Sequence, residues 1–373
     1  MFHVKHRHQT LLIALGAVSL LAVGCMGGNF STPTGWATPV ESGGVILVQI
    51  ERGRLDALEL TSSGGMFERW HYPVSDDGVE LSAIYATPIV EDGVIYLAGF
   101  SGDVVALSLA TGRPLSRWGA PVRLDGHIVA TPVFDGDRIY VPTDRGRVSV
   151  LDSMSGDLVT VLLDLGSDSA IWGDPVLVGD TLYVGELDRK LHAIRVQSGE
   201  ERWVRHLDGA LAAPLEIDRG LLLVGSLNAR LYALDVDSEG ALNWSFTGDG
   251  WFWSRPLVVG DVIYAPTVKG TVYAIDRSSG EERWFFESGI SQIRTSLAMT
   301  GGVLVAAGRD GDLFGISPSN GALLWQSTLS DDVLADPLVR GSELLYVTTD
   351  GDLMRVHAQD GRVERISTVR QGG

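Results

Sequence analysis

Cys25 is the residue with the clearest potential for covalent chemistry, because it is the only cysteine among 373 residues and follows small side chains. Before it come the basic residues Lys5 and Arg7, and then an almost unbroken apolar run from Leu11 to Val23. A positive segment, a short apolar run and small residues mark a cleavable secretory signal peptide. We therefore expect residues 1–24 to be a lipoprotein signal peptide and the thiol of Cys25 to be acylated.

Acyl chains on Cys25 would anchor the chain to a membrane, because each buried methylene contributes about 0.8 kcal/mol. Residues 25–35 are rich in Gly, Ser, Thr and Pro and are expected to be a flexible tether. In a two-membrane bacterium Met26, which is not aspartate, indicates sorting to the outer membrane, facing the periplasm. With a single membrane, the anchor would lie in the outer face of the cytoplasmic membrane. The alternative is a soluble secreted protein in which the lone cysteine is incidental.

The sequence contains few of the residue patterns that form catalytic or metal sites. It contains neither the G-x-S-x-G nucleophile elbow nor the P-loop pattern. Asp-Gly-Asp steps such as 310–312 lack the further ligands of a calcium loop and are better explained as tight turns. The histidines after the signal peptide lack the spacing of metal ligands: His71, His127, His192, His206 and His357. We predict no catalytic, cofactor or metal residues, and the formal net charge of −18 argues against nucleic acid as a partner.

Aromatic and arginine side chains gather at short steps in the chain, most of which contain proline. Aromatic side chains and arginine are the usual anchors of a protein contact. The predicted partner-binding residues are Trp172, Trp251, Phe252, Trp253, Arg255 and Arg294. The competing interpretation is that these side chains line a channel or fill the core where each repeat begins.

A repeated unit of strand, turn and strand must position these side chains. Residues 271–275 alternate as a strand, residues 276–280 supply a turn, and the run into Trp284 has the pattern of a second strand. The tryptophans expected to lie between neighbouring repeats are Trp70, Trp118, Trp203, Trp244, Trp284 and Trp325. The third repeat has Val161 and Leu162 near this position and the last has Ile366, so weaker contacts are expected there.

A second signature, a short step usually ending in proline, precedes each hairpin. Its copies begin at residues 37, 86, 130, 173, 212, 254, 295 and 335, and the copy at 295–297 lacks the proline. Eight copies with four strands each, at a spacing of about 40 residues, predict an all-β, eight-bladed β-propeller over residues 36–373. We expect one domain and a monomer. Residues 361–366 are expected to complete the last blade, with the ring closed by blade packing alone.

The repeats also carry a family resemblance. Ala-Thr-Pro, Ile-Tyr-Val, Val-Tyr-Ala-Ile-Asp and Ser-Gly-Glu-Glu-Arg-Trp together resemble the pyrroloquinoline-quinone-type propeller repeat over residues 36–367. An eight-bladed lipoprotein of this size is similar to the BamB family, the accessory lipoproteins of the machinery that assembles outer-membrane β-barrels. The resemblance implies a noncatalytic scaffold that binds the barrel-assembly subunit through loops on one face.

Two other functions stay open on the sequence. The chain could be a cell-surface propeller lipoprotein that binds a different envelope protein or a ligand. The repeat also occurs in pyrroloquinoline-quinone-dependent dehydrogenases, but those chains are longer. Their alcohol-oxidising types also carry an adjacent cysteine pair, whereas this propeller contains no cysteine. The repeat is therefore no evidence for the cofactor, and none is predicted.

Overall fold

The computed structural model describes residues 35–373 except 63, 74–80, 290–291, 367 and 370–373. Internal contacts define Gly35–Gly373 as one compact unit. The predicted signal peptide, Cys25 and all but the last residue of the predicted tether lie outside the described residues. Within the part of the chain that is described, no helix is both long and apolar enough to span a membrane.

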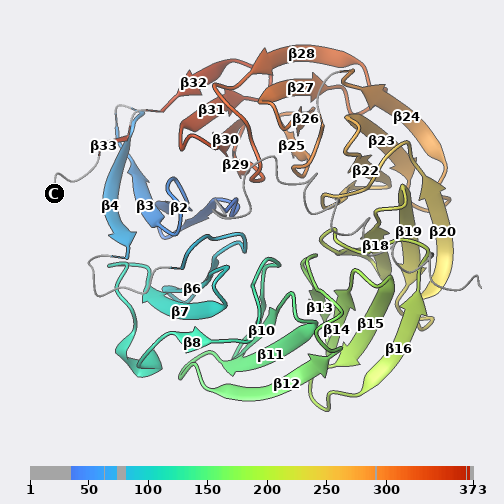
Figure 1. Cartoon of the computed structure of the whole chain (residues 1–373). Helices are drawn as coiled ribbons and strands as arrows, with labels where there is room; N and C mark the ends of the chain where they lie inside the picture. Colours follow the sequence, from blue (N-terminus) through green and yellow to red (C-terminus); the bar gives the residue numbers. More distant parts are fainter. Residues whose placement is uncertain (1–34, 63, 74–80, 290–291, 367, 370–373) are drawn as a thin grey trace, which may run out of the picture. The chain divides into compact units, whose positions relative to one another are not determined.

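The described unit is a ring of eight blades, and each blade is a sheet whose strands follow one another from the centre outward (Figure 1). The predicted all-β, eight-bladed propeller with four strands per blade is confirmed. A single 3₁₀ helix, η1 (Ser116–Trp118), interrupts the strands of the described residues.

The strands of each blade are consecutive in the chain. Blades 1 to 4 consist of β1 (Val40–Ser42), β2 (Val45–Val48), β3 (Leu55–Leu60) and β4 (Met66–Tyr72); β5 (Ile89–Glu91), β6 (Val94–Ala98), β7 (Asp103–Ser108) and β8 (Val122–Arg123); β9 (Val133–Asp135), β10 (Arg138–Pro142), β11 (Arg147–Asp152) and β12 (Leu158–Asp164); β13 (Val176–Val178), β14 (Thr181–Gly185), β15 (Lys190–Arg195) and β16 (Glu201–His206). Blades 5 to 8 consist of β17 (Glu216–Asp218), β18 (Leu221–Gly225), β19 (Arg230–Asp235) and β20 (Ala241–Thr247); β21 (Leu257–Val259), β22 (Val262–Pro266), β23 (Thr271–Asp276) and β24 (Glu282–Glu287); β25 (Ala298–Thr300), β26 (Val303–Ala307), β27 (Asp312–Ile316) and β28 (Leu323–Thr328); β29 (Leu338–Arg340), β30 (Glu343–Val347), β31 (Leu353–His357) and β32 (Val363–Arg365). A last strand, β33 (Thr368–Val369), follows β32.

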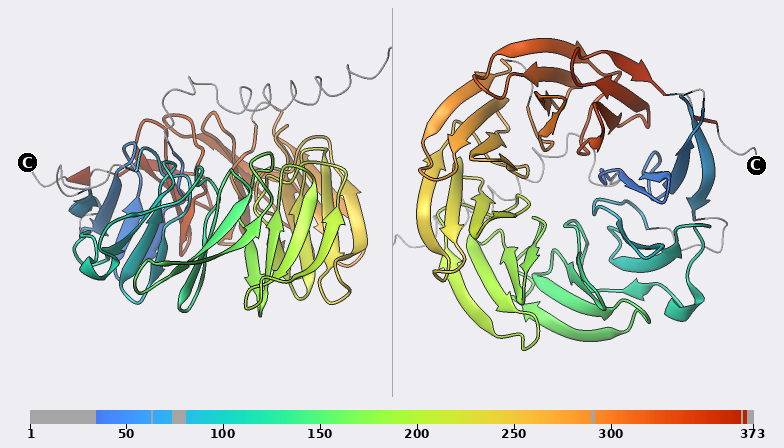
Figure 2. Two further views of the ribbon diagram at one scale, coloured as in Figure 1. Left: turned by 60° about the horizontal axis from the view of Figure 1, so that its bottom comes forward. Right: turned by 180° about the vertical axis from the view of Figure 1, so that it is seen from behind.

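The antiparallel order of the strands gives the ring two distinct faces (Figure 2). The connection between one blade and the next emerges on the same side as the turn between the second and third strands of each blade. We call this side the connection face. The other two turns of each blade emerge on the opposite side, which we call the turn face.

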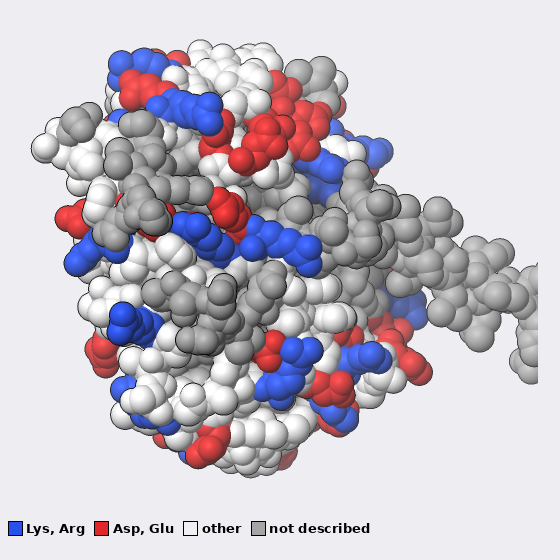
Figure 3. Space-filling model, turned by 60° about the vertical axis from the view of Figure 1, so that its left-hand side comes forward, with Lys and Arg blue, Asp and Glu red and all other residues white. Residues whose placement is uncertain are grey.

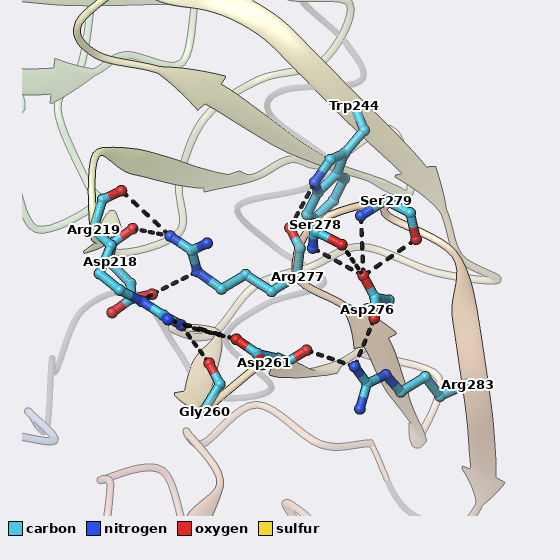
Figure 4. A network of polar contacts seen from close by, with 10 residues as sticks. All are labelled: Asp218, Arg219, Trp244, Gly260, Asp261, Asp276, Arg277, Ser278, Ser279 and Arg283. Carbon is cyan, nitrogen blue, oxygen red and sulfur yellow. Dashed lines mark hydrogen bonds and ion pairs between the residues drawn. The ribbon is translucent and has the colours of Figure 1, made fainter.

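The turn between β23 and β24 illustrates how the sequence forms each outer hairpin. Asp276 ends β23, and its Oδ1 accepts the main-chain N–H of Ser278 at 2.9 Å. The Ser278 hydroxyl and the Arg283 guanidinium hold the pKa of the Asp276 carboxyl well below its usual range (Figure 4). Gly280 then takes a left-handed conformation with φ of +73°, which glycine adopts without a steric penalty. The predicted turn residues therefore each have a structural task.

The six tryptophans lie between blades, each with its indole ring on a turn glycine of the following blade. Trp244 donates its indole N–H to the carbonyl of Arg277 at 3.0 Å (Figure 4), and a methyl group at Gly280 would lie 2.6 Å from the ring. A side chain larger than hydrogen therefore does not fit at that glycine. Equivalent N–H bonds of 2.8 to 3.1 Å join Trp70 to Leu109, Trp118 to Ser153, Trp284 to Pro318 and Trp325 to Ala358. The ring of Trp203 lies on Gly240 at the same place.

Blade 2 supplies its tryptophan from a helix rather than from a strand. Pro114 has no N–H to donate at the position where the fourth strand would begin. The chain forms η1 there, and β8 is only two residues long. Trp118, the last residue of η1, still reaches the turn glycine Gly156 of blade 3.

The contact between blades 3 and 4 lacks the tryptophan, and the residue at its position is Thr160. In other blades, a small residue such as Ala274 lies opposite the tryptophan, whereas Thr160 lies opposite Val150. Val161 and Leu162, which the sequence placed near this position, follow Thr160 in β12. Val161 is exposed, and Leu162 is buried 3.9 Å from the position of a methyl group at Gly199.

Blade 8 joins blade 1 through a strand as well as through packing. The predicted fourth strand is present as β32, and Ile366 is buried between the two blades with Ile46 and Leu345. Beyond it, β33 pairs in parallel with β4, with Thr368 opposite Met66 (Figure 1). The expectation of closure by blade packing alone is therefore wrong: the C-terminal segment adds a fifth strand to blade 1.

Two arginines of blade 8 reinforce this closure. Arg340 donates two hydrogen bonds to the carboxylate of Glu41 in blade 1, at 2.8 and 3.0 Å. Arg355 stands where other blades have the small residue opposite tryptophan, and its Nη2 donates to the carbonyl of Gly64 at 3.0 Å. The contact between blades 8 and 1 thus uses guanidinium groups where six of the other contacts between blades use indoles.

Replacing Trp244 by alanine is expected to lower the free energy of unfolding by about 3–5 kcal/mol, because a large buried side chain leaves a cavity between two blades. Thr160→Ala is the matched control, since Thr160 occupies the same place in blade 3 but is exposed. It should change stability by no more than about 0.5 kcal/mol. Urea unfolding of both variants measures the difference, and equal losses would contradict the role given to the indole.

Ending the chain after Ile366 is expected to lower the free energy of unfolding by about 1–2 kcal/mol, because it removes the main-chain hydrogen bonds of β33. Amide hydrogen exchange in β4 should become faster. A chain ending after Val369 keeps the whole of β33 and serves as the control. Unchanged exchange in β4 after the shorter truncation would count against strand closure.

Candidate protein-interaction face

Connections between blades are fixed to the blades below them by a repeated main-chain bond. In the connection to blade 6, the carbonyl of Trp251 accepts the N–H of Val268, which lies in the turn between β22 and β23, at 3.0 Å. The equivalent acceptors in the other connections are Ala83, His127, Ala170, Ala210, Gln292 and Asp332, at 2.7 to 3.0 Å. The described parts of these connections are therefore held to the turns of the blades that they enter.

The residue after each of these acceptors is a buried anchor. Phe252 holds this place in the connection to blade 6 and is only 1% exposed. Its ring lies 6.4 Å from those of Phe246 and Tyr273. The equivalent anchors are Ile84, Ile128, Ile171, Leu211, Ile293 and Val333, all at most 1% exposed. The prediction that Phe252 binds a partner is therefore corrected, because its side chain belongs to the core.

The residues flanking the anchors lie nearer the surface. Trp251 and Trp253, on either side of Phe252, are half-buried, and so is Trp172, which follows the anchor Ile171. Trp172, Trp253 and Arg294 occupy the same position in three different connections, those to blades 4, 6 and 7. The alternation of inward and outward side chains thus separates the tryptophans from the phenylalanine between them.

The two predicted arginines already have partners within the protein. Arg255 contacts Asp174 at 3.1 Å and Glu216 at 3.4 Å, and its Nη1 donates to the carbonyl of Leu215 at 2.8 Å. Arg294 donates to the side-chain oxygen of Gln292 at 3.1 Å. The predicted site residues did not include Asp174, which the sequence does not distinguish from Asp336 at the same position of another step.

A second aromatic group lies on the connection face beside blades 1 to 3. The ring of Trp36 lies 4.3 Å from that of Tyr85, and Tyr85 lies 5.2 Å from Phe100. His127 then stacks on Phe100 at 4.2 Å with an interplanar angle of 5°. Trp36 and Tyr85 each stand directly before a proline step, whereas Phe100 comes from the turn between β6 and β7 and His127 from the connection to blade 3.

A buried ionic cluster supports the connection that carries Trp172. In blade 4, His192 Nδ1 lies 2.6 Å from Glu201 Oε1, and His192 Nε2 lies 3.3 Å from Glu186 Oε1. Lys190 Nζ lies 3.2 Å from the same Glu186 oxygen. Leu187, next to Glu186, donates its N–H to the connection at the carbonyl of Ala170. The sequence alone does not indicate this cluster, because the partners of His192 become neighbours only in the folded hairpins.

The pKa values of this cluster follow from burial and charge acting in opposite directions. Burial alone would lower the pKa of His192, but hydrogen bonds to Glu186 and Glu201 outweigh it, and the net direction is upward. For Glu186, burial would raise the pKa, but bonds led by that to His192 lower it. The pair of His192 and Glu186 is therefore most stable when the imidazole is charged and the Glu186 carboxylate is ionised.

The described residues contain no group of three or more His, Cys, Asp or Glu side chains that could hold a metal ion. On the side of the ring seen in Figure 3, basic and acidic side chains lie interspersed. Among the described residues, ion pairs join Arg69 to Glu59 and Arg340 to Glu41. On the connection face, the half-buried tryptophans offer aromatic contact beside the ion pairs of Arg255.

The fold and this face define a class: an eight-bladed propeller of pyrroloquinoline-quinone-type repeats with an aromatic connection face. The family model described as "Outer membrane protein assembly factor BamB" matches residues 31–159, 118–211, 204–331 and 268–364. Because these matches together span most of the chain, the protein belongs to the BamB family, and the resemblance seen in the sequence is confirmed.

Three known proteins illustrate the relationship. An outer membrane protein assembly factor BamB of Burkholderia pseudomallei is 29% identical over 204 residues, which is 50% of this chain and 53% of the relative. The match thus spans about half the length of that curated relative. BamB of Moraxella catarrhalis superimposes with a TM-score of 0.70 at 18% identity, covering 86% of this chain and 95% of that one. A europium-containing methanol dehydrogenase gives 0.66 at 15% identity, covering 87% and 82%. At these identities, the structural matches establish the fold alone.

We expect the protein to lose stability as the pH rises through the raised pKa of His192. The stabilisation by the charged imidazole is fully present below the histidine's unfolded pKa of about 6.5 and disappears once the folded protein releases the proton. His192→Gln should remove this part of the pH dependence, whereas His206→Gln, an exposed histidine in the same blade, should retain it. Urea unfolding between pH 6 and 9 provides the comparison. A His192→Gln protein with the wild-type pH profile would refute the assignment.

Proposed function

We propose that this protein is a noncatalytic, lipid-anchored scaffold that assists outer-membrane protein assembly by binding the barrel-assembly subunit. The observation that carries the proposal is the match of the BamB family model to residues 31–364 in overlapping segments. The name of the Burkholderia relative, an outer membrane protein assembly factor, points to the same process. The noncatalytic role rests on this family relationship, and the dehydrogenase match supports a common fold only.

We propose that partner binding uses the connection face around Trp172, Trp251 and Trp253. These half-buried tryptophans project from connections whose neighbouring anchors, Ile171 and Phe252, are fully packed. A large aromatic side chain held on a rigid segment loses little conformational entropy on binding, which favours such residues as interface anchors. Arg255 contributes by bonding to the neighbouring connection and blade, and Arg294 lies at the position equivalent to Trp253 in the connection to blade 7.

We propose that acylated Cys25 anchors the propeller in the outer membrane, facing the periplasm. Support comes from the signal sequence before Cys25, from Met26 after it, and from the process named for the family. The propeller itself is proposed to act as a monomer, because its ring closes within one chain through β33 and β4.

Affinity capture of the acylated protein from its native envelope, followed by mass spectrometry, tests the function. Recovery of the barrel-assembly subunit is the expected result. Enrichment of a different envelope protein without that subunit would overturn the assembly role and favour a separate surface-binding role for the same propeller.

Replacing Trp251 by serine is expected to weaken capture of the partner about tenfold, because an interface anchor contributes on the order of 1.4 kcal/mol or more. The melting temperature should stay within a few degrees of wild type, about the shift that 1 kcal/mol causes in a domain of this size. Phe285→Ser removes an aromatic side chain that is 51% exposed on the outer strand β24, and it should leave capture unchanged. Capture by titration and thermal melting are measured on both variants. A large loss of stability in the Trp251 variant would instead assign that ring to the core.

A further inference from the structure

A chain of hydrogen bonds runs around the inner edge of the ring from blade 2 to blade 6. It joins the second residue of successive proline steps. The N–H of Thr87 donates to Thr131 Oγ1 at 3.1 Å, and the N–H of Thr131 donates to Asp174 Oδ1 at 2.7 Å. Asp174 Oδ2 then accepts from Arg255 Nη2 at 3.1 Å.

The bond from Asp174 to Arg255 differs from the others because it passes over a whole blade. Asp174 belongs to the connection to blade 4 and Arg255 to the connection to blade 6, and the equivalent residue of blade 5 is Ala213. The methyl side chain of Ala213 offers no polar group of its own at this place in the chain of bonds. The guanidinium also bonds to blade 5 through the carbonyl of Leu215 and the carboxylate of Glu216.

The guanidinium of Arg255 favours the ionised form of its two carboxylate partners, Asp174 and Glu216. The pKa values of Asp174 and Glu216 are both raised, because burial outweighs the attraction of the guanidinium in each case. The side chain of Asp174 is only 21% exposed, and that of Glu216 is 28% exposed. Without Arg255, two poorly hydrated carboxylates would remain at the inner edge of blades 4 and 5, and these segments would have to rearrange.

These two residues stand at equivalent places next to the half-buried tryptophans. Asp174 is two residues after Trp172, and Arg255 is two residues after Trp253. The other end of the connection to blade 6 is held by Asp249, whose carboxylate accepts the hydroxyl groups of Thr267 and Thr271, both at 2.8 Å. The connection is therefore fixed at Asp249, at Phe252 and at Arg255.

We propose that the ion pair of Asp174 and Arg255 is a latch that holds the connections of blades 4 and 6 at a fixed separation. It thereby presents Trp172, Trp251 and Trp253 as one preorganised docking surface. The inference deepens the proposed function and rests on it for the role of the tryptophans. Asp174 and Arg255 are positioning residues: they act on the partner through the two connections.

The latch can be tested in the protein alone, without its binding partner. Removing either member of the pair should loosen both connections, including the one in which no residue was changed. Asp174→Asn should thus speed amide hydrogen exchange in residues 249–254, about 80 residues away in the sequence, and Arg255→Met should speed it in residues 170–173. We expect exchange about fivefold or more faster in both segments, since each loses one of its fixed points.

The test compares hydrogen exchange and partner capture in the full-length acylated protein. The variants are Asp174→Asn, Arg255→Met and the conservative Arg255→Lys, which keeps the charge and should restore part of the protection. Arg277→Met is the matched control, because Arg277 bonds Asp218 of the preceding blade at 2.6 Å but on the turn face (Figure 4). It should leave the exchange of both connections unchanged. Capture of the barrel-assembly subunit should weaken about three- to tenfold in Arg255→Met and Asp174→Asn only.

The outcomes separate the latch from the proposed function. Wild-type exchange in both connections of Arg255→Met, in a protein that is folded by circular dichroism, would overturn the latch. Equal loosening by Arg277→Met would overturn it as well, because the effect would then follow from any lost contact between blades. Faster exchange in the two latch variants, with no capture of the assembly subunit by the wild-type protein, would support the latch and remove the assembly role.

Discussion

The contact between an indole ring and the turn glycine of the next blade is the interaction on which the ring depends. A single blade cannot cover both faces of its sheet, so stability comes from the contact with each neighbour. Trp244 shows how closely that contact is specified: the ring needs a residue without a side chain at Gly280 and a carbonyl at Arg277 for its N–H. It also needs a small residue opposite in its own blade, which is Ala233. In this repeat, one contact therefore constrains the residue type at three positions, which are Trp244, Gly280 and Ala233.

The two seams without tryptophan show what happens when this constraint is released. Between blades 3 and 4, Thr160 lies opposite the larger Val150, and the polar cluster around His192 occupies the adjoining interior of blade 4. Between blades 8 and 1, Arg355 and the added strand β33 join the ends of the chain. Between blades 3 and 4, buried apolar side chains such as Leu162 and Ile194 also pack together, whereas the contact between blades 8 and 1 adds main-chain pairing and guanidinium bonds.

The parts of the fold that could be predicted are those encoded within one repeat. The period, the turn glycine and the tryptophan four residues later are local, and they determine the number of blades. The burial of Phe252 could also have been predicted, because Ile171 and Ile293 occupy the equivalent position in other connections. The two flanking tryptophans made Phe252 look like part of an exposed aromatic group. The ion pair of Asp174 and Arg255 could not have been predicted, since it joins residues 81 positions apart that meet only at the inner edge of a closed ring. Strand β33 could not have been predicted either, because a two-residue strand carries no periodicity.

The turn face and the connection face differ because of the antiparallel strand order within each blade. On the turn face, Arg277 and Asp218 join neighbouring blades through tight turns whose sequence is fixed by the strands they connect. On the connection face, the chain must cross from the outer edge of one blade to the inner edge of the next, and the described crossings share a buried anchor and a bonded carbonyl before it. The positions on either side of the anchor are free to vary, and blades 4 and 6 place tryptophan there. A rigid ring can therefore vary its binding surface without altering its core, because the residues that recognise a partner alternate along the chain with the residues that hold the blades together.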